Sequence, residues 1–577
     1  MGYKETYEAW LANPYFDADT KKELESIAGD ENEIKERFYA DLEFGTAGLR
    51  GVIGAGTNRM NIYTVRKATQ GLANYIIGQN GQNKGVAIAY DSRRMSPEFA
   101  DEAACCLAAN GIKAYVFESL RPTPELSFAV RELGCISGIN ITASHNPPEY
   151  NGYKVYWEDG AQITPPHDKG IMDEVKAVTD YATVKTMDKA EAEKAGLYET
   201  IGAKIDDRYM EELKKNVLHP EAIKEASDKL TIVYTPLHGT GNIPARRILK
   251  ELGFNNVYVV PEQELPDGEF PTVSYPNPEA AEAFELALKL AKEKDADLVL
   301  ATDPDADRLG VYVKDSKSGE YICLTGNMSG SFLADYEIGQ KLAIEGKLPE
   351  DGELIKTIVT SNMVDAMVEH YGIKLTECLT GFKWIGKEIL RMETTGKGHY
   401  LFGFEESYGC LIGTHARDKD AIVATMALCE AAAFYKLQGK TIWDAMLEMY
   451  EKYGYYKDDV IAISHKGIEG LAKIKSIMDN LRQNPPTEFG SYKVTAFRDY
   501  QEDIIKDMAT GETKPTGIPK SNVLYFELTD GAWLCVRPSG TEPKIKLYFG
   551  VVGENLDDAD KKSKDLAVIV KDLLDKL

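Results

Sequence analysis

Three carboxylates in one short loop are the strongest sign of chemistry in this sequence. Asp303, Asp305 and Asp307 alternate along DPDADR, after the apolar run ADLVLAT and before LGVYV. In an extended loop, alternate side chains point the same way, so the three carboxylates can meet at one point. Such hard oxygen ligands suit Mg²⁺ or Ca²⁺, and three of them leave positions for phosphate oxygen and water. The loop predicts a divalent cation site, and an acidic surface turn is the alternative.

An EF-hand calcium loop also begins with alternating acids and has to be considered. That loop needs Gly at its sixth position and Glu at its twelfth, and it lies between two helices. Here those positions hold Arg308 and Lys314, and apolar strands flank the loop. The pattern therefore argues against an EF-hand.

A serine loop follows another apolar strand. ITASHNPPEYNGYK places Ser144 just after that strand, next to His145 and near Lys154. A serine hydroxyl is a poor nucleophile unless a base or a metal activates it, and no G-x-S-x-G turn marks a hydrolase. Taken alone, the loop could equally be a Ser/Asn/Pro turn. Together with the acidic loop, it suggests metal-assisted phosphoryl transfer at serine.

Two further loops carry groups that bind phosphates and sugars. RPSGTEPKIK, at 537–546, combines a guanidinium, two hydroxyls and an exposed glycine backbone, which are the parts of a phosphate clamp. GFEESYG, at 403–409, has adjacent acids that can accept hydrogen bonds from sugar hydroxyls, and Lys419 follows in HARDKDA. An ordinary hairpin turn and a solvated turn are the respective alternatives.

Three repeats supply the elements that position these loops. Each begins with a strand, a polar loop and a helix; the strands open GVAIAYDSRR, LTIVYTPLHGTG and IKTIVTSN, and the helices end at Gly111, Gly253 and Gly372. Glycine directly after a helix suits the left-handed cap position. We also expect Ser96-Pro97 and Asn277-Pro278 to begin helices, as a capping residue followed by proline.

Each repeat continues with another helix, another apolar strand and one chemical loop, which contains Ser144, Asp303 or Glu405. Because ligands bind at the carboxyl ends of strands in open α/β sheets, the three loops can form one composite cleft. Three unrelated α/β units with ordinary polar loops are the alternative.

From about residue 456 the strands alternate apolar and polar residues, as in YKVTAF, which predicts a mostly antiparallel sheet. The fold class is therefore three related α/β mixed-sheet domains plus a C-terminal α+β domain around a central cleft. The predicted bounds are 1–204, 205–325, 326–455 and 456–577. An acidic helical extension precedes the first repeat.

The composition limits the partners of the protein. The chain has 577 residues, with 67 Lys and Arg against 92 Asp and Glu, and its net charge of −25 argues against broad nucleic-acid or anionic-membrane binding. It has no apolar run long enough for a membrane span and does not begin with a secretory pattern. The eight cysteines form no C-x-x-C pair, which favours reduced, buried thiols. We expect a cytoplasmic protein.

The loops together resemble those of the α-D-phosphohexomutase superfamily. TASHNP, DPDADR, GFEESYG and RPSGTEP occur in that order, and FGTAGLRG at 44–51 is similar too. The resemblance spans nearly the whole chain, and the GFEESYG…RDKDA context is most similar to the bacterial phosphoglucomutase branch. The sugar loop departs from some members in having Phe404 before the acids.

The resemblance implies a role for each matching residue. Ser144 would be a phosphoserine and, with Asp303, Asp305 and Asp307, a ligand of Mg²⁺. The other catalytic residues that it implies are His145, Lys154, Arg308, Lys419 and Arg50, the last of which would hold the serine loop. The residues that it implies in substrate binding are Thr380, Gly381, Glu405, Ser407, Arg537, Ser539, Gly540 and Thr541, the last four as a clamp for the non-transferring phosphate.

The activity implied is interconversion of glucose 1-phosphate and glucose 6-phosphate, with glucose 1,6-bisphosphate as activator and intermediate. The partner would be a sugar phosphate, and the protein a monomer or homodimer. The same chemistry on mannose, pentose or amino sugar phosphates remains an alternative. A Mg²⁺-dependent sugar phosphatase and a non-catalytic sugar-phosphate sensor are alternatives of other classes. The sequence leaves open which lysine or histidine acts as general acid or base.

Overall fold

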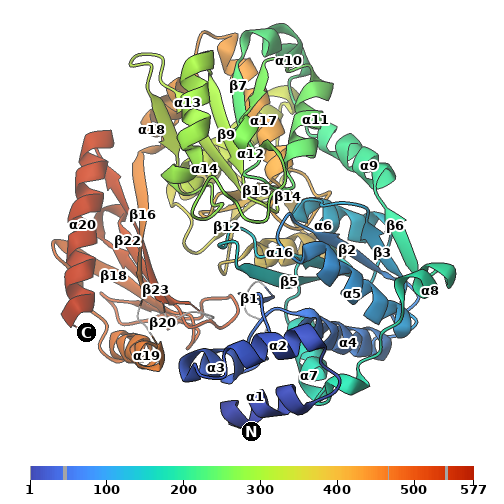
Figure 1. Cartoon of the computed structure of the whole chain (residues 1–577). Helices are drawn as coiled ribbons and strands as arrows, with labels where there is room; N and C mark the ends of the chain where they lie inside the picture. Colours follow the sequence, from blue (N-terminus) through green and yellow to red (C-terminus); the bar gives the residue numbers. More distant parts are fainter. Residues whose placement is uncertain (1, 43–47, 465–466, 540–543, 577) are drawn as a thin grey trace.

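The computed structural model describes residues 2–42, 48–464, 467–539 and 544–576. The N-terminal extension forms three short helices, as predicted (Figure 1). They are α1 (Tyr3–Ala12), α2 (Ala18–Ser26) and α3 (Glu31–Phe38). Their aromatic side chains form a separate small core against α4, in which Trp10 stacks on Phe16 with ring centroids 4.0 Å apart. This core fixes the extension on the first domain.

The first domain has a six-stranded sheet in the order β1-β5-β4-β2-β3-β6. Its strands are β1 (Leu49–Val52), β2 (Val86–Tyr90), β3 (Ala114–Phe117), β4 (Ser137–Ile141), β5 (Tyr150–Trp157) and β6 (Tyr198–Ile201). Its helices are α4 (Ile62–Gly78), α5 (Ser96–Ala109), α6 (Thr123–Glu132), α7 (His167–Ala177) and α8 (Lys189–Lys194). β5 runs antiparallel between β4 and β1, whereas β2, β3, β4 and β6 are parallel.

The second domain has a five-stranded sheet in the order β11-β10-β9-β7-β8. Its strands are β7 (Ile232–Thr235), β8 (Val257–Val259), β9 (Leu298–Thr302), β10 (Leu309–Lys314) and β11 (Tyr321–Leu324). Its helices are α9 (Ala203–Lys214), α10 (Pro220–Ala226), α11 (Asn242–Leu252), α12 (Pro261–Glu264) and α13 (Glu285–Lys294).

The third domain has a four-stranded sheet in the order β13-β12-β14-β15. Its strands are β12 (Gly352–Thr357), β13 (Lys374–Cys378), β14 (His399–Glu405) and β15 (Gly409–Leu411). Its helices are α14 (Gly326–Glu345), α15 (Met363–Tyr371), α16 (Phe382–Thr395), α17 (Ala421–Lys436) and α18 (Ile442–Tyr453).

The predicted repeat is the same in all three domains. A first strand (β2, β7 or β12) pairs in parallel with a second (β4, β9 or β14), and a reversed strand follows the chemical loop. Gly111, Gly253 and Gly372 have φ of +75°, +101° and +65°, as expected of residues in the left-handed region after a helix. The three chemical loops therefore begin at the ends of the equivalent strands β4, β9 and β14.

One predicted cap and one predicted helix start were wrong, although α5 does begin at Ser96. Ser96 is the first residue of α5 rather than its cap, because its hydroxyl donates to Asp91 at 2.8 Å instead of accepting from the helix. Asn277 lies in a turn in which its side chain accepts from the backbone N–H of Glu279 at 3.1 Å, and α13 begins only at Glu285. In both places a local capping pattern yields to another hydrogen bond.

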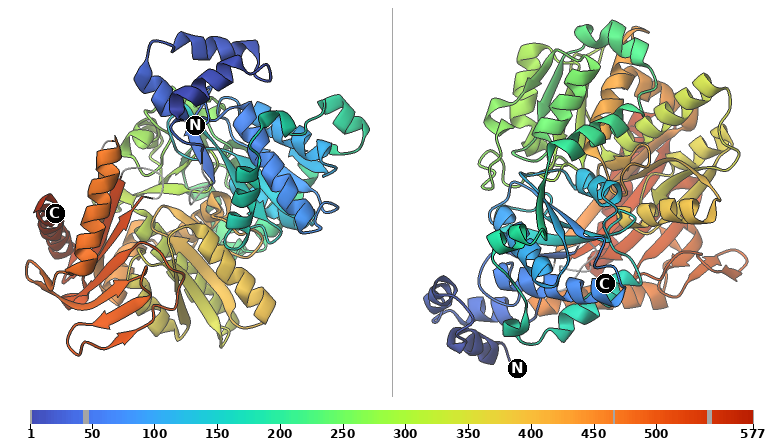
Figure 2. Two further views of the ribbon diagram at one scale, coloured as in Figure 1. Left: turned by 90° about the horizontal axis from the view of Figure 1, so that it is seen from below. Right: turned by 90° about the vertical axis from the view of Figure 1, so that its right-hand side faces the viewer.

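The fourth domain has an antiparallel sheet under two helices (Figure 2). Its strands are β16 (Tyr455–Ser464), β17 (Glu488–Phe489), β18 (Tyr492–Asp499), β19 (Ile504–Asp507), β20 (Thr513–Lys514), β21 (Leu524–Leu528), β22 (Trp533–Pro538) and β23 (Lys544–Gly553). Its helices are α19 (Gly467–Gln483) and α20 (Leu556–Lys576). The predicted fold class is thus confirmed.

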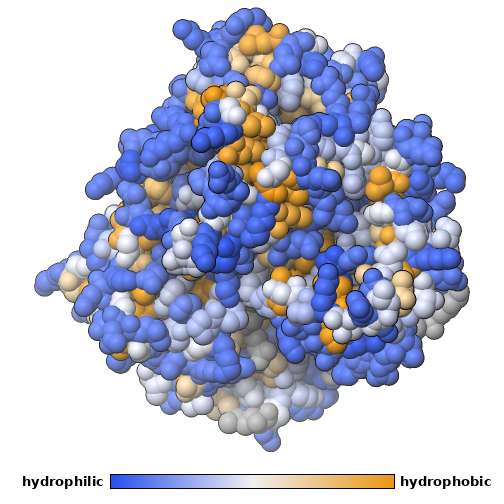
Figure 3. Space-filling model, turned by 180° about the vertical axis from the view of Figure 1, so that it is seen from behind, coloured by the Kyte–Doolittle hydropathy of each residue, from blue (hydrophilic) through white to orange (hydrophobic). Residues whose placement is uncertain are grey.

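The described part of the chain contains no helix that is both long and apolar enough to cross a membrane. The face in Figure 3 is mostly hydrophilic, with apolar residues in limited groups. Seven of the eight cysteines are buried, and Cys323 is exposed.

Candidate active site

Ser144 lies in a strained turn directly after β4. Its φ of +53° is in the left-handed region, which is unusual for a residue with a side chain. Its backbone N–H donates to the Thr142 hydroxyl at 2.8 Å, which helps to hold this conformation. The Ser144 hydroxyl is buried and donates to Oδ2 of Asp303 at 3.0 Å. The serine and acidic loops, which are 159 residues apart, therefore meet directly.

Arg93 braces the serine loop from behind. Its guanidinium donates to the carbonyl oxygens of Ser144 at 2.6 Å, Pro147 at 2.8 Å and Tyr150 at 3.1 Å. It is fully buried, and it pairs with Asp91 at 3.2 Å. The sequence analysis did not identify this residue, although the DSRR segment that carries it follows β2 at the same sheet edge. Arg93 thus supplies the hydrogen-bond donors that these buried loop carbonyls would otherwise need from water.

The acidic loop is a turn rather than the extended segment that the alternation suggested. The backbone N–H of Ala306 donates to the Asp303 carbonyl at 2.9 Å, and Ala306 has a φ of +50°. The turn brings one carboxylate oxygen from each of Asp303, Asp305 and Asp307 within 4.8 Å of the others. All three side chains are buried. The predicted convergence is present, but it comes from the turn.

Hydrogen bonds fix the Asp303 and Asp305 carboxylates. Asp303 accepts backbone N–H bonds from Asp307 and Arg308, both at 3.1 Å. Asp305 accepts from Thr123, the first residue of α6, at 2.7 Å and from Lys154 at 2.8 Å. A second residue that the sequence analysis missed, Thr123, thus ties the first domain to the acidic loop.

The electrostatics of the triplet favour a bound cation. Burial and the neighbouring acids raise the pKa of Asp303 and of Asp307. Burial also acts to raise the pKa of Asp305, but Lys154 and Thr123 outweigh it and hold that pKa below its usual range. Among the described residues, Oδ1 of Asp305 and Oδ1 of Asp307 are buried without a hydrogen-bond partner. Buried acceptors without donors fit a divalent cation that prefers oxygen ligands.

Four cationic side chains surround this centre. Lys154 from β5 pairs with Asp305, and Lys419 lies 3.1 Å from Asp307. Arg50 from β1 donates to the Asn146 side chain at 2.9 Å, which places it on the serine loop. The fourth, Arg308, forms an ion pair with Glu279 and lies 3.8 Å from Asp307.

His145 lies beside the serine. Its Nδ1 is 3.2 Å from the Ser144 hydroxyl oxygen. Burial first, and then the charges of Arg308 and Arg50, hold the pKa of His145 well below its ordinary value. The imidazole is therefore neutral near neutral pH, and a neutral ring nitrogen can accept a proton.

The predicted sugar loop lies at the end of β14. The Ser407 hydroxyl donates to Glu405 at 2.8 Å, and Lys419 lies 3.6 Å from Glu405. Burial and the adjacent Glu405 raise the pKa of Glu406 to about 7. Phe404 is fully buried and packs where Gly330 of α14 has no side chain, so this departure from some phosphohexomutases lies in the core.

Thr380 and Gly381 directly precede α16, and Gly381 has a φ of +107°. Within the described residues, neither forms a hydrogen bond with the acidic centre. Their predicted contact with a sugar stays a prediction.

The predicted phosphate clamp is only partly described. Arg537 lies directly opposite Lys546 in the β22–β23 pair, so these two cations share one face of the sheet. The backbone N–H of Ser539 donates to the Lys544 carbonyl at 2.7 Å. Gly540 and Thr541, which the sequence analysis placed in the clamp, lie outside the described residues.

Charged groups of other domains act on Lys546 of the fourth domain. Burial lowers the pKa of Lys546, Glu406 and Glu279 oppose this effect, and Arg308 and Arg537 add to it. The charges that affect Lys546 thus belong to the second, third and fourth domains. The sequence analysis quoted this lysine in RPSGTEPKIK but gave it no role.

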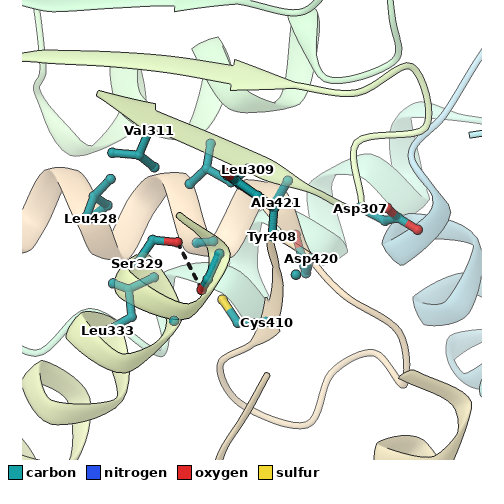
Figure 4. Close-up of a pocket in the computed structure, with 14 residues that line it drawn as sticks. Asp307, Leu309, Val311, Ser329, Leu333, Tyr408, Cys410, Asp420, Ala421 and Leu428 are labelled. Atoms are coloured by element: carbon teal, nitrogen blue, oxygen red, sulfur yellow. Dashed lines mark hydrogen bonds between the residues drawn. The ribbon is translucent and has the colours of Figure 1, made fainter. Parts of the chain in front are cut away.

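An apolar core supports the acidic loop from behind. Figure 4 shows Leu309 and Val311 of β10, Leu333 of α14 and Leu428 of α17 around a narrow cavity, with Asp307 at its rim. This cavity of about 10 Å³ holds at most one water-sized body. It is too small for a sugar, and the apolar side chains around it pack behind the acidic loop.

Three α/β/α domains and a C-terminal domain around one serine–acid centre are the architecture of phosphohexomutases. The phosphoglucomutase/phosphomannomutase α/β/α domains I, II and III match residues 41–182, 207–319 and 326–453, and the C-terminal domain of that family matches 474–557. The chain belongs to the phosphoglucomutase/phosphomannomutase family, as its loops predicted.

Relatives and solved structures agree with this assignment. A phosphoglucomutase of Staphylococcus aureus (strain MRSA252) is 37% identical over 530 residues, which cover 92% of this chain and 93% of that protein. The fold resembles a phosphoglucomutase/phosphomannomutase family protein from Burkholderia thailandensis, with 20% identity, a TM-score of 0.61, and 92% and 96% of the two chains covered. It also resembles parafusin, a phosphoglucomutase from Paramecium, in an open form, with 18% identity, a TM-score of 0.64 and the same coverage.

Proposed function

We propose that this protein is a phosphoglucomutase that interconverts glucose 1-phosphate and glucose 6-phosphate through a phosphorylated Ser144. The name of the Staphylococcus aureus relatives, 37% identical over 92% of the chain, supports this choice of sugar. The structural observation that carries the proposal is the 3.0 Å hydrogen bond from Ser144 to Asp303. It places a strained serine at a buried acidic centre that has unpartnered oxygens.

The reaction has two transfers at one serine. In the first, a free hydroxyl of the sugar phosphate attacks the phosphorus on Ser144, the bond from phosphorus to the serine oxygen breaks, and the hydroxyl loses its proton to a base. This gives glucose 1,6-bisphosphate. After the sugar turns around, the Ser144 oxygen attacks the other phosphate, and the released sugar oxygen takes up a proton. No water is consumed, and serine regains its phosphoryl group.

Positive charge around the transferred group carries most of the catalysis in such a reaction. Asp303, Asp305 and Asp307 would hold Mg²⁺ together with an oxygen on Ser144, and the ion would supply positive charge to the phosphoryl oxygens. Lys154, Lys419, Arg308 and Arg50 add four fixed cations at the same place. The His145 ring lies beside the transferring group, with its Nδ1 3.2 Å from the serine oxygen.

The remaining loops would hold the sugar in both orientations. Glu405 and Ser407 would bind sugar hydroxyls in either orientation. Arg537, Ser539, Gly540 and Thr541, with Lys546 beside them, would bind whichever phosphate is not being transferred. Enclosure of the substrate by the fourth domain would keep water from the phosphoserine and so prevent hydrolysis.

The test is a comparison of 1-phosphates of glucose, mannose, ribose and glucosamine, each with Mg²⁺ and a catalytic amount of the matching bisphosphate. The expected result is fastest formation of glucose 6-phosphate, with no matching release of inorganic phosphate. Stoichiometric phosphate release would instead identify a phosphatase. Binding without turnover of any substrate would identify a sensor, and a faster rate on another sugar would assign the enzyme to that sugar.

A further inference from the structure

The loop that carries Lys419 belongs to the third domain but is held by contacts from the first and second domains. It connects β15 to α17, and the backbone N–H of Arg417 donates to the hydroxyl of Ser127 in α6 at 2.8 Å. Asp420 accepts from the hydroxyl of Tyr209 in α9 at 2.8 Å. The position of Lys419 therefore depends on contacts between domains, and not only on its own sheet.

The closest of these contacts to Lys419 comes from β5. Asp418, the residue before Lys419, accepts from the Tyr156 hydroxyl at Oδ2 with a distance of 2.8 Å. Tyr156 is fully buried, and Asp418 is 4% exposed. Lys154 lies two residues earlier on the same strand, so both side chains leave the same face of the sheet. One strand thus reaches the acidic loop through Lys154 and the Lys419 loop through Tyr156.

Three carboxylates share the Lys419 ammonium. Asp418 accepts the Lys419 backbone N–H at 2.8 Å through Oδ1, and the same oxygen lies 3.3 Å from Nζ. Asp307 is 3.1 Å and Glu405 3.6 Å from Nζ. Gly409 lets the β15 backbone lie close to this side chain, since a Cβ there would be 1.9 Å from Cδ of Lys419. The ammonium position is therefore set by the balance of these acids.

We propose that Tyr156 is a positioning residue for Lys419 and, through it, for the phosphoryl-transfer centre. Its hydroxyl occupies Oδ2 of Asp418, so that Asp418 binds Lys419 only through Oδ1 and the ammonium stays beside Asp307. Without this donor, Asp418 would be a buried carboxylate with an unsatisfied oxygen, and the Lys419 ammonium, 3.3 Å from its other oxygen, could shift to bind it. The inference rests on the mutase reaction proposed above. Because the predicted phosphate clamp in the fourth domain is untouched, the loss falls on the transfer step.

The test compares Tyr156→Phe with Tyr153→Phe in the full-length protein. Tyr153 is a matched control, because it lies on the same strand, is fully buried, and shares a hydrogen bond of 3.0 Å with Thr69 away from the site. We expect Tyr156→Phe to lower kcat about tenfold, the effect of one hydrogen bond to a charged group, with KM within about twofold of the wild type. Tyr153→Phe should retain the wild-type kcat.

A double-mutant cycle then shows whether Tyr156 acts through Lys419. If it does, Tyr156→Phe should change kcat little in a Lys419→Gln protein, so that the two effects are not additive. A wild-type kcat for Tyr156→Phe, an equal loss in Tyr153→Phe, or additive effects would each overturn the inference. Absence of mutase turnover in the wild type and in Tyr153→Phe would instead refute the proposed function.

A second variant covers the case in which Tyr156→Phe does not fold. Asp418→Asn keeps an oxygen for the Tyr156 hydroxyl but removes the negative charge that shares the Lys419 ammonium. It should also lower kcat about tenfold at an unchanged KM. A wild-type kcat in a folded Asp418→Asn protein would overturn the inference.

Discussion

Glu430 makes the stability of the protein depend on pH in a direction that can be tested. It lies in α17, is 1% exposed, and accepts backbone N–H bonds from Leu218 at 3.1 Å and His219 at 3.0 Å. It also accepts from the hydroxyl of Tyr336 in α14 at 3.0 Å. Burial first, and then the nearby Glu337, raise the pKa of Glu430 from 4.5 to about 7. The folded protein therefore holds a proton that the unfolded chain releases at lower pH.

The sign and size of the effect follow from these two pKa values. Below about pH 4.5 the carboxyl is protonated in both states, and its full contribution to folding is present. As the pH rises to about 7, the unfolded chain ionises first, and stability falls by about 3 kcal/mol at ~1.4 kcal/mol per pH unit. Glu430→Gln keeps an acceptor oxygen but never ionises. Relative to the wild type, it should gain up to about 3 kcal/mol between pH 5 and pH 8.

Urea unfolding of both proteins at pH 5 and pH 8 measures this gain as a difference in midpoints. Glu353→Gln is a control in which no change between pH 5 and pH 8 is expected. Burial acts to raise the pKa of Glu353, but bonds from Thr376 and Lys374 outweigh it and lower that pKa. Above about pH 5 the Glu353 carboxyl is therefore ionised in both the folded and the unfolded state, and the stability difference between Glu353→Gln and the wild type should be the same at pH 5 and pH 8. If Glu430→Gln gains nothing between pH 5 and pH 8, the buried carboxyl does not hold its proton and the reasoning is wrong.

Three further predictions concern the site. Ser144→Ala should abolish mutase turnover while sugar-phosphate binding, measured by calorimetry, persists; retained turnover would contradict the phosphoserine. Asp305→Asn should weaken Mg²⁺ dependence, measured by titrating the metal into the chelator-treated enzyme, and activity that survives chelation in the wild type would count against the metal site. Arg537→Ala should raise KM about tenfold or more, as expected when a charged hydrogen bond to phosphate is lost, whereas an unchanged KM would remove Arg537 from the clamp.

Much of the fold could be predicted because the repeat is local and regular. The glycines after three helices, the apolar strands and the loop that follows each second strand all lie within short stretches of sequence. The capping patterns at Ser96 and Asn277 failed because these side chains form other hydrogen bonds. Ser96 donates to Asp91, and Asn277 accepts a backbone N–H within its own turn. The four domain bounds and the oligomeric state stay predictions.

The site was predictable to the extent that its residues lie in the chemical loops. Ser144 and the acidic triplet were found because their residue types are unusual between apolar strands. Arg93, Thr123 and Glu279 were missed because each acts on a loop from another segment. Arg93 binds backbone carbonyls, Thr123 binds an acid in the next domain, and Glu279 binds Arg308. Residue type alone does not reveal such partners, since segments that are distant in sequence meet only in the folded chain.

The apolar cores distinguish the fourth domain from the first three. One apolar cluster runs continuously through the first three domains, from Ala87 to Tyr450, and these domains supply the serine, the acids and both lysines. The fourth domain has its own core and meets the third through a smaller cluster that includes Leu379 and Tyr548, while Tyr456 and Leu556 pack against the large cluster. Displacing the fourth domain would expose less apolar surface than separating the first three, and so would cost less free energy. In the proposed reaction, the transfer centre would stay fixed while the fourth domain opens and the bisphosphate turns around.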